Sequence, residues 1–354
     1  VTFTLGTQTA SAITDSTGRA TVSLDFAPST PQTVIADFAG DELYVPASVA
    51  ASYPETLRPS YPGNCGTDYW IALPNPCRDN GECPAGERGS EPFYRHHLFF
   101  SAEASTAVRV EMPGLGRTAW TFVDSTGVGQ LELPIDEVVA VRRTGEVVND
   151  SLHIQSERIV CVHGLEFLRQ GAEGFLALPT NSLGREYVVG AYEGLLTGGF
   201  GQSWVSQFVV VGTQNGTDVT IDPAYDVVRG PDVAGGFGSA HVPFTVRLDE
   251  GEVIQIRAYS SSTPGPGDTY YDLTGSTITA SAPVAVLGGH MCPFVPPGIA
   301  ACNTLVEQLP SVETLGTEYL VTPFAVRGSG YLLRVVAATS GTEVRIDGAL
   351  VATL

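Results

Sequence analysis

No lysine occurs anywhere in this chain of 354 residues, so all 18 basic residues are arginines, against 38 aspartates and glutamates. The resulting formal net charge of −20 makes nucleic acids and anionic membranes poor partners. The absence of lysine also excludes a Lys–Asn isopeptide cross-link, because that bond needs the lysine amine as its nucleophile. Any covalent cross-link must therefore come from cysteine.

Long apolar runs are also missing. No run approaches the roughly 18 residues of a membrane-spanning helix, which predicts no membrane insertion. The chain opens Val-Thr-Phe without a charged and then apolar leader, which is typical of an excised or mature fragment. Short runs of Val, Thr, Tyr and Phe alternate with turns rich in the 40 glycines and 24 prolines, so the expected fold class is all-β.

Catalytic motifs are absent from the sequence. There is no Gly-x-Ser-x-Gly elbow, and the carboxylate pairs Asp136-Glu137 and Asp249-Glu250 recur at equivalent places, which is typical of turns. His96 and His97 are adjacent, so on a strand they point to opposite faces, and all six histidines are expected to be structural. We therefore expect no enzyme and no cofactor.

One acidic loop is a weak calcium candidate. Asp79, Asn80 and Glu82 supply oxygen atoms around a glycine turn, as calcium loops do. The loop lacks the Asp-x-Asp spacing of a full calcium site, so a solvated disulfide loop is the favoured interpretation.

The six cysteines are expected to form disulfides in an oxidising compartment, outside the cytosol. Cys77 and Cys83 lie close in sequence, as do Cys292 and Cys302, and this leaves Cys65 with Cys161 by elimination. Free core thiols or a metal site are the alternatives, but no Cys-x-x-Cys pair with matching histidines occurs.

Residues 1–54 alternate apolar and polar positions in short strands. The segments Val1-Thr2-Phe3-Thr4-Leu5-Gly6, Thr14 to Val22, and Ala36 to Asp41 resemble the second half of immunoglobulin-like repeats of bacterial surface adhesins. A sandwich of this kind needs seven or so strands, whereas about four fit here, so the module is expected to be partial. We expect a strand from upstream sequence or from a neighbouring subunit to complete it. Prolines then predict a stiff linker at residues 55–64.

The remaining sequence contains an internal repeat. Three segments open alike, with Gly66-Thr67-Asp68-Tyr69, Gly184-Arg185-Glu186-Tyr187 and Gly316-Thr317-Glu318-Tyr319. Matching strands follow, with Thr106 to Val110, Thr217 to Ile221 and Thr342 to Ile346. The repeats are expected at residues 66–183 (repeat 1), 184–315 (repeat 2) and 316–354 (repeat 3, incomplete).

The number of strands expected in each repeat favours one architecture and leaves a second one possible. About eight strands in about 120 residues correspond to two four-stranded blades, which predicts a β-propeller-like domain of about five to six blades. Tandem β-sandwiches, one per repeat, are the alternative.

The most specific stretch runs from Cys292-Pro293-Phe294 through Cys302 to Leu305-Val306-Glu307-Gln308-Leu309-Pro310. With the repeated Gly-x-acid-Tyr openings, it resembles the IgGFc-binding protein N-terminal domain family over residues 65–354. The chain departs from the family pattern at Asn303-Thr304, where an Asp-His pair is common. The resemblance implies an extracellular protein that interacts with glycoproteins and has no assigned catalytic residues.

Two loops are candidate contact sites. Phe294, Val295 and Pro296 lie in the proline-rich cysteine loop, and Tyr270 and Tyr271 follow a long polar loop. Packing against the core is the alternative for both loops. The leading hypothesis is a structural or adhesive protein of the bacterial cell surface, such as a filament or stalk subunit that self-assembles. The alternative is a module that binds a surface glycan or glycoprotein.

Overall fold

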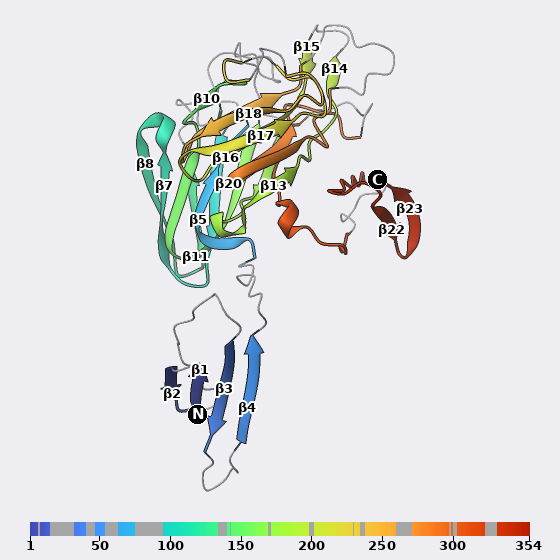
Figure 1. Cartoon of the computed structure of the whole chain (residues 1–354). Helices are drawn as coiled ribbons and strands as arrows, with labels where there is room; N and C mark the ends of the chain where they lie inside the picture. Colours follow the sequence, from blue (N-terminus) through green and yellow to red (C-terminus); the bar gives the residue numbers. More distant parts are fainter. Residues whose placement is uncertain are drawn as a thin grey trace. The chain divides into compact units, whose positions relative to one another are not determined.

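The computed structural model describes most of the chain, and it divides into two compact units, Val1–Pro62 and Gly63–Leu354. The described residues are 1–5, 8–14, 32–39, 47–53, 63–74, 95–133, 140–141, 143–168, 171–197, 202–228, 230–233, 238–259, 271–296, 299, 303–322 and 331–354. They form β-strands and three short 3-10 helices, and none of them lies in an α-helix (Figure 1). The expected all-β class is therefore confirmed.

The N-terminal unit holds one antiparallel sheet in the order β2-β1-β3-β4. The strands are β1 (Thr2–Leu5), β2 (Gln8–Ser11), β3 (Gln32–Phe38) and β4 (Ala47–Tyr53). A second sheet, which would complete a sandwich, is not found among the described residues, so the immunoglobulin-like interpretation stays a prediction. The proline-rich segment 54–62 lies outside the described residues.

Repeat 1 forms a seven-stranded sheet in the order β8-β7-β11-β6-β9, with β12 and β5 also paired to β11. Its strands are β5 (Cys65–Ile71), β6 (Arg95–Ser101), β7 (Thr106–Met112), β8 (Arg117–Val123), β9 (Val128–Glu132), β11 (Leu152–Leu168) and β12 (Gly171–Leu176). The first half of β11 pairs with β5 and β7, and its second half pairs with β6 and β12. One long strand therefore joins two halves of a sheet.

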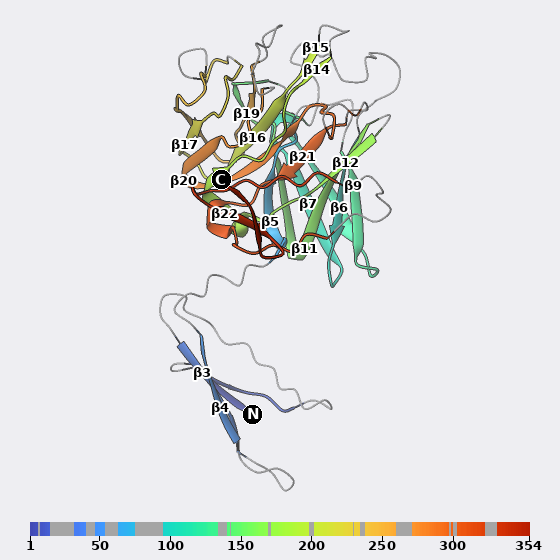
Figure 2. The ribbon, with the colours of Figure 1, turned by 90° about the vertical axis from the view of Figure 1, so that its right-hand side faces the viewer.

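Repeat 2 has the same topology, in the order β18-β17-β20-β16-β19, with β21 and β13 paired to β20 (Figure 2). Its strands are β13 (Gly184–Val188), β16 (Ser206–Gly212), β17 (Thr217–Asp222), β18 (Phe244–Leu248), β19 (Val253–Arg257), β20 (Thr277–His290) and β21 (Leu305–Gln308). The short strand β10 (Val147–Val148) extends this sheet at β19.

The expected division into four-stranded blades is not confirmed. Each repeat places its strands in one sheet, because the long strand β11 or β20 has partners along both of its halves. The propeller therefore stays a prediction without support from the strand pairing.

The two cores explain why strand β16 is buried at every position. All seven residues of β16 are buried, because the strand has a core on each face. Phe208 and Val210 belong to the core of repeat 2, whereas Val209 and Val211 join the core of repeat 1. One face of the sheet of repeat 2 therefore packs in its own core, and the other face packs against the core of repeat 1.

The repeated Gly-x-acid-Tyr motif has a clear structural role. In repeat 1 the Tyr69 hydroxyl accepts a hydrogen bond from the Gly66 N–H and donates one to the Val160 carbonyl. In repeat 2 the Tyr187 hydroxyl joins Gly184 to Val284 in the same way. Both tyrosines are buried, so each hydroxyl ties the opening strand to the long strand.

Repeat 3 repeats only part of this arrangement. The Gly316 N–H again donates to the hydroxyl of Tyr319, at 2.9 Å, but Tyr319 is 67 % exposed. Strands β22 (Glu343–Ile346) and β23 (Ala349–Thr353) pair with each other. Residues 316–322 follow the sequence pattern of β5 and β13 but form no strand, and no long strand like β11 or β20 lies among the described residues of repeat 3.

The remaining elements connect the sheets. The 3-10 helices are η1 (Pro113–Leu115), η2 (Thr180–Ser182) and η3 (Val312–Thr314), and β14 (Leu195–Thr197) pairs with β15 (Gln202–Trp204). Helices η2 and η3 each precede a Gly-x-acid-Tyr motif, so they mark equivalent junctions between repeats.

Candidate functional site: a charged and aromatic sheet face

Three adjacent strands of repeat 1 place polar side chains in two rows on one face. In the first row, Gln155 of β11 lies opposite Asp68 of β5 and Arg109 of β7. In the second row, His153 of β11 lies opposite Trp70 and Glu111. Partners on neighbouring strands share a face and lie about 4.5 to 5.5 Å apart, so the two rows come together although they are remote in sequence.

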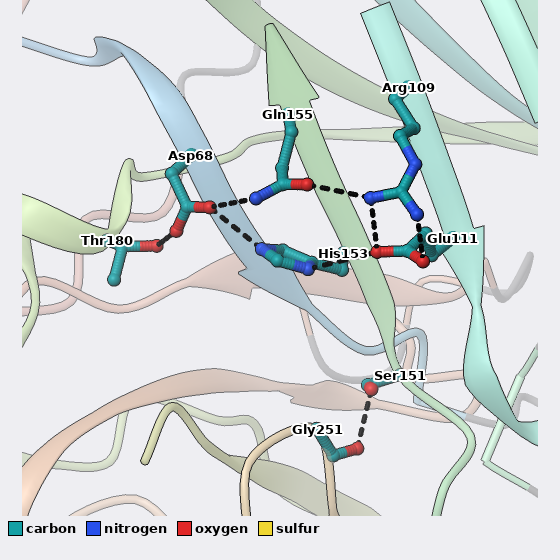
Figure 3. Close-up of polar contacts among 8 residues, drawn as sticks. All are labelled: Asp68, Arg109, Glu111, Ser151, His153, Gln155, Thr180 and Gly251. Carbon is teal, nitrogen blue, oxygen red and sulfur yellow. Dashed lines mark hydrogen bonds and ion pairs between the residues drawn. The ribbon is translucent and has the colours of Figure 1, made fainter.

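The side chains of these rows bond one another (Figure 3). His153 Nε2 lies 2.8 Å from Asp68 Oδ1, and the Gln155 amide donates to the same oxygen at 3.2 Å. Arg109 donates to Gln155 Oε1 at 3.0 Å and bonds both oxygens of Glu111. His153 Nδ1 lies 3.4 Å from Glu111 Oε2, so the imidazole lies between two carboxylates.

Two further contacts fix this network in place. The Thr180 hydroxyl of η2 donates to Asp68 Oδ2 at 2.6 Å. The Trp70 ring stacks on the His153 ring, with centroids 3.9 Å apart and planes 8° from parallel. A preorganised network of this kind presents fixed donors and acceptors, so little ordering cost remains for a partner.

Asp68 stays ionised within the network. Burial by itself raises its pKa, but the hydrogen bonds of His153, Thr180 and Gln155 and the charge of His153 act in the opposite direction. The net result is a pKa below the ordinary value for aspartate. The face therefore keeps a fixed negative charge at neutral pH.

Exposed aromatic side chains continue this face onto the edge strand β8. Trp120 lies opposite Arg109, and Phe122 lies opposite Ala107. Trp120 is 64 % exposed and Phe122 is 58 % exposed. Aromatic and arginine side chains dominate the binding energy of protein interfaces, so their exposure side by side is informative. We call Asp68, Arg109, Glu111, Trp120, Phe122, His153 and Gln155 the charged–aromatic face.

Repeat 2 lacks this face at the equivalent positions. Matching the registers of the two sheets sets Trp120 and Phe122 against Thr245 and Arg247. The same register sets His153 against Thr277. The charged–aromatic face is therefore a property of repeat 1 and not of the repeat fold.

A second cluster of titratable groups lies on β6, β11 and β12. Glu166 lies opposite both His96 and Glu173, and its Oε1 is 3.7 Å from His96 Nδ1. Glu166 is 1 % exposed, and neither of its carboxyl oxygens has a hydrogen-bond partner among the described residues. Burial, together with the charge of Glu173, raises the pKa of Glu166 to about 8. Burial and the charge of His97 lower the pKa of His96 to about 4, so both groups are neutral at pH 7.

The structure places some of the expected site residues. Cys65 and Cys161 form a disulfide, which confirms that pairing, and Cys292 is also disulfide-bonded. In the proline-rich loop Phe294 is half-buried and Val295 and Pro296 are exposed, so the contact role expected for them stays a prediction.

Tyr271 is not a contact residue. It is 1 % exposed and packs edge-on against Tyr225, with ring centroids 5.3 Å apart. Its backbone has a φ of +52°, and in this turn its side chain lies in the core of repeat 2. The contact role expected for Tyr271 is therefore wrong, and the packing alternative holds.

Several expected site residues lie outside the described part of the chain. They are Cys77, Cys83, Cys302, Tyr270 and the calcium candidates Asp79, Asn80 and Glu82. Their disulfide pairings, the contact role of Tyr270 and the calcium site stay predictions.

Among the described residues, no group of three His, Cys, Asp or Glu side chains is arranged to hold a metal ion. In the same ranges no helix has the length and apolar character needed to cross a membrane.

The charged–aromatic face was not predicted from the sequence. His153 was expected to be a structural histidine, and Arg109 and Trp120 were not singled out. The available signal was the alternation of β7 and β8, which puts Arg109, Glu111, Trp120 and Phe122 at positions of one parity. That pattern does not show which strands pair, so it could not predict that side chains of β5 and β11 lie beside those of β7.

Repeats 1 and 2 form sheets with the same strand order, and in each a tyrosine hydroxyl ties the opening strand to the long strand. Repeat 1 adds the exposed charged–aromatic face. These features define a protein built from β-sheet repeats. The chain belongs to the IgGFc-binding protein family, because the family model described as IgGFc binding protein matches residues 173–354. The match covers repeats 2 and 3 and begins well after residue 65, where the resemblance was expected to begin.

Among known proteins, the chain is similar to the IgGFc-binding protein of Homo sapiens, with 31 % identity over 199 residues. This alignment covers 56 % of the chain but only 3 % of the human protein, so the chain corresponds to a small part of that relative. No solved structure matches the chain.

Proposed function

We propose that this chain is an extracellular, non-catalytic module that binds a protein or glycoprotein partner through its charged–aromatic face. The observation that carries the proposal is the exposure of Trp120 and Phe122 beside a fully bonded charged network, at positions that are Thr245 and Arg247 in repeat 2. The name of the human relative states that it binds IgG Fc, which makes a glycoprotein partner a reasonable class for this chain.

The chemistry of the face supports binding rather than catalysis. The carboxylates and the imidazole bond one another and Arg109, so their proton-accepting atoms are already engaged. A large aromatic surface next to a fixed arginine and fixed carboxylates suits a partner with both apolar and polar groups. The Cys65–Cys161 disulfide supports an oxidising, extracellular location.

The direct experiment measures binding of the 354-residue chain to two immobilised probes, human IgG Fc and gastric mucin. The double variant Trp120→Ala/Phe122→Ala should weaken binding at least tenfold, since hot-spot aromatics contribute about 2 kcal/mol or more. The matched control is Thr245→Ala/Arg247→Ala, which changes the same sheet positions of repeat 2 and should leave binding unchanged. Equal losses in both variants would contradict the assignment to repeat 1.

The nature of the partner can be resolved in the same assay. Binding that survives enzymatic removal of glycans from the probe assigns recognition to the protein surface, whereas binding that is lost assigns it to the glycan. Failure of the wild-type chain to bind either probe would count against a glycoprotein partner.

Self-assembly into a filament or stalk is the second candidate function. It is favoured by the way repeat 2 packs on repeat 1, since a stacking contact between repeats can also join separate chains. Negative-stain microscopy of native material tests it, because ordered polymers are expected. The bacterial, cell-surface origin suggested by residues 1–54 stays part of this proposal.

A further inference from the structure

Strands β12 of repeat 1 and β21 of repeat 2 belong to different sheets but contact each other where the two repeats meet (Figure 2). Side chains next to one strand bond the backbone next to the other. The Asn303 amide donates to the Ala172 carbonyl at 3.0 Å, and the Leu178 N–H donates to Gln308 Oε1 at 2.8 Å. We call this contact the β12–β21 junction.

Two glutamates cross the junction in opposite directions. Glu307 of β21 accepts a hydrogen bond from the Leu176 N–H of β12, with nitrogen and oxygen 3.3 Å apart. Glu173 of β12 is hydrogen-bonded to the backbone of Val306 in β21. Each strand therefore holds its partner through a carboxylate, and the two carboxylates lie close enough for the charge of Glu307 to act on Glu173.

A third carboxylate lies behind Glu173. Glu166 of β11 is the direct cross-strand partner of Glu173, and the charge of Glu173 acts on it in turn. We call Glu166, Glu173 and Glu307 the glutamate row. The row runs from the buried interior of repeat 1 to an exposed position on repeat 2, so three groups of like charge meet at one junction.

The groups that face the row bring little fixed positive charge. His96 of β6 lies opposite Glu166, but burial and the charge of His97 lower its pKa to about 4. On β20 the residue opposite Glu307 is Gly288, and the exposed His163 of β11 lines the same cavity as Glu307. Among the described residues, every arginine ion pair goes to a carboxylate outside the row. Backbone N–H groups are therefore the main partners of its charge.

Protons can take the place of the missing positive charge. Burial and the charge of Glu173 raise the pKa of Glu166 to about 8, and burial and the charge of Glu307 raise the pKa of Glu173 to about 7. Because these values lie above the ordinary 4.5, the closed junction binds protons more tightly than an open one. The resulting stabilisation is fully present below about pH 4.5 and is lost as the pH rises through about 7 to 8.

We propose that the β12–β21 junction is a pH-dependent contact, closed while the glutamate row shares protons and open once all three carboxylates are ionised. In the open state, repulsion between like charges separates β12 from β21. The apolar contact between the repeats persists, because residues such as Val209 and Leu287 do not titrate. A cavity of about 520 Å³, lined by both Leu176 and Glu307, changes its shape when the junction opens. The residues involved differ from the charged–aromatic face, so the inference stands independently of the proposed binding function.

The experiment measures amide hydrogen exchange of the 354-residue chain at pH 5.5 and pH 8.5, with each rate divided by the intrinsic rate at the same pH. In the wild type, the protection of residues 171–178 and 303–309 should fall at least tenfold from pH 5.5 to pH 8.5. A raised pKa that becomes ordinary on opening accounts for a change of about tenfold per pH unit between the two values. At pH 8.5 these residues should exchange well before β16 and β19, because the junction opens without unfolding of the repeats.

Two variants test the role of the row. Glu173→Gln and Glu307→Gln each remove one charge and keep an oxygen that can accept the backbone N–H, at positions that are not fully buried. Each should reduce the loss of protection at pH 8.5 at least threefold. The matched control is Glu186→Gln, which changes an exposed glutamate of β13 outside the row and should keep the pH dependence of the wild type.

Three results would overturn the proposal. Equal protection of residues 171–178 at the two pH values means that ionisation does not open the junction. A loss of protection that is unchanged in both Glu173→Gln and Glu307→Gln assigns the pH dependence to groups outside the row. Exchange of the junction and of β16 at the same rate at pH 8.5 means that the two repeats unfold together instead of opening locally.

Discussion

Repeats 1 and 2 share one strand topology but differ in how their exposed and buried positions are used. In repeat 2, the second half of the sheet is buried on both faces, because one face belongs to its own core and the other to the core of repeat 1. In the equivalent strands of repeat 1, one face is buried and, among the described residues, the other carries side chains such as His97 and His163 that are not fully buried. Which strand positions are buried therefore depends on whether another repeat packs on that face of the sheet, and not on the strand topology alone.

The same contrast extends to cross-links and charge. Cys65 and Cys161 join the opening strand of repeat 1 to its long strand, whereas the register sets Cys161 against Ala285 in repeat 2. Repeat 1 also holds the charged network, in which the positions of Arg109, His153 and Gln155 are threonines in repeat 2, whereas Asp68 and Glu111 are matched by Glu186 and Asp222. In repeat 1 the opening strand and the long strand are thus joined by a disulfide and by a polar network, whereas no disulfide joins the equivalent strands of repeat 2.

Removing the disulfide should produce the largest difference between the repeats. Cys65→Ala/Cys161→Ala leaves the opening strand of repeat 1 without a disulfide to its long strand, as in repeat 2, and releases a constraint between residues 96 apart in sequence. We expect a loss of about 2–5 kcal/mol in the free energy of unfolding, measured by urea denaturation. Hydrogen exchange should rise in β5–β12 and stay low in β16–β20. An equal rise in both sets of strands would show that the repeats unfold as one unit.

Glu166 and its counterpart His290 should give the two repeats opposite dependence on pH. The folded-state pKa of Glu166 is about 8, above its ordinary value, so the unfolded state releases the proton first. This group therefore removes stability as pH rises from about 4.5 to about 8. Burial lowers the pKa of His290 to about 3, so that group adds stability as pH rises from about 3 to about 6.5.

Thermal unfolding from pH 4 to pH 9 tests this contrast. Glu166→Gln should raise the midpoint at pH 8, by an amount equivalent to a few kcal/mol, and should change it little at pH 4.5. His290→Gln should reduce the fall of the unfolding midpoint below about pH 6.5 and should leave the midpoint at higher pH unchanged. An unfolding midpoint at pH 8 that is no higher in Glu166→Gln than in the wild type would contradict a buried neutral carboxyl at Glu166.

Replacing the tyrosine of each Gly-x-acid-Tyr motif by phenylalanine should give the smallest effects. The loss in the free energy of unfolding should be larger at the two buried tyrosines than at the exposed one. Tyr69→Phe and Tyr187→Phe each leave a buried glycine N–H and a buried valine carbonyl without a partner, which should cost about 1–3 kcal/mol. Tyr319→Phe should cost almost nothing in urea denaturation, because water can replace the hydroxyl at this exposed position. A large loss in Tyr319→Phe would mean that the third motif is buried in solution.

The sequence predicted features that recur and missed features that depend on long-range register. The Gly-x-acid-Tyr segments and the strands after Thr106, Thr217 and Thr342 could be found because repetition makes a local pattern visible. The charged–aromatic face could not, since Asp68, Arg109 and His153 meet only when three strands pair in one register. The long strands were missed for a related reason. The irregular pairing between Gln155 and Val160 in β11 makes one strand look like two.

Because residues of β16 belong to the cores of both repeats, the core of repeat 1 can be completed only after repeat 2 has been synthesised. Repeat 1 leaves the ribosome first, but part of its core is supplied by Val209 and Val211, which are made later. Its apolar surface therefore stays open until repeat 2 has been translated and its central sheet has formed. A shortened chain that ends after repeat 1 would keep that surface exposed and prone to aggregate, whatever its own strands can pair with.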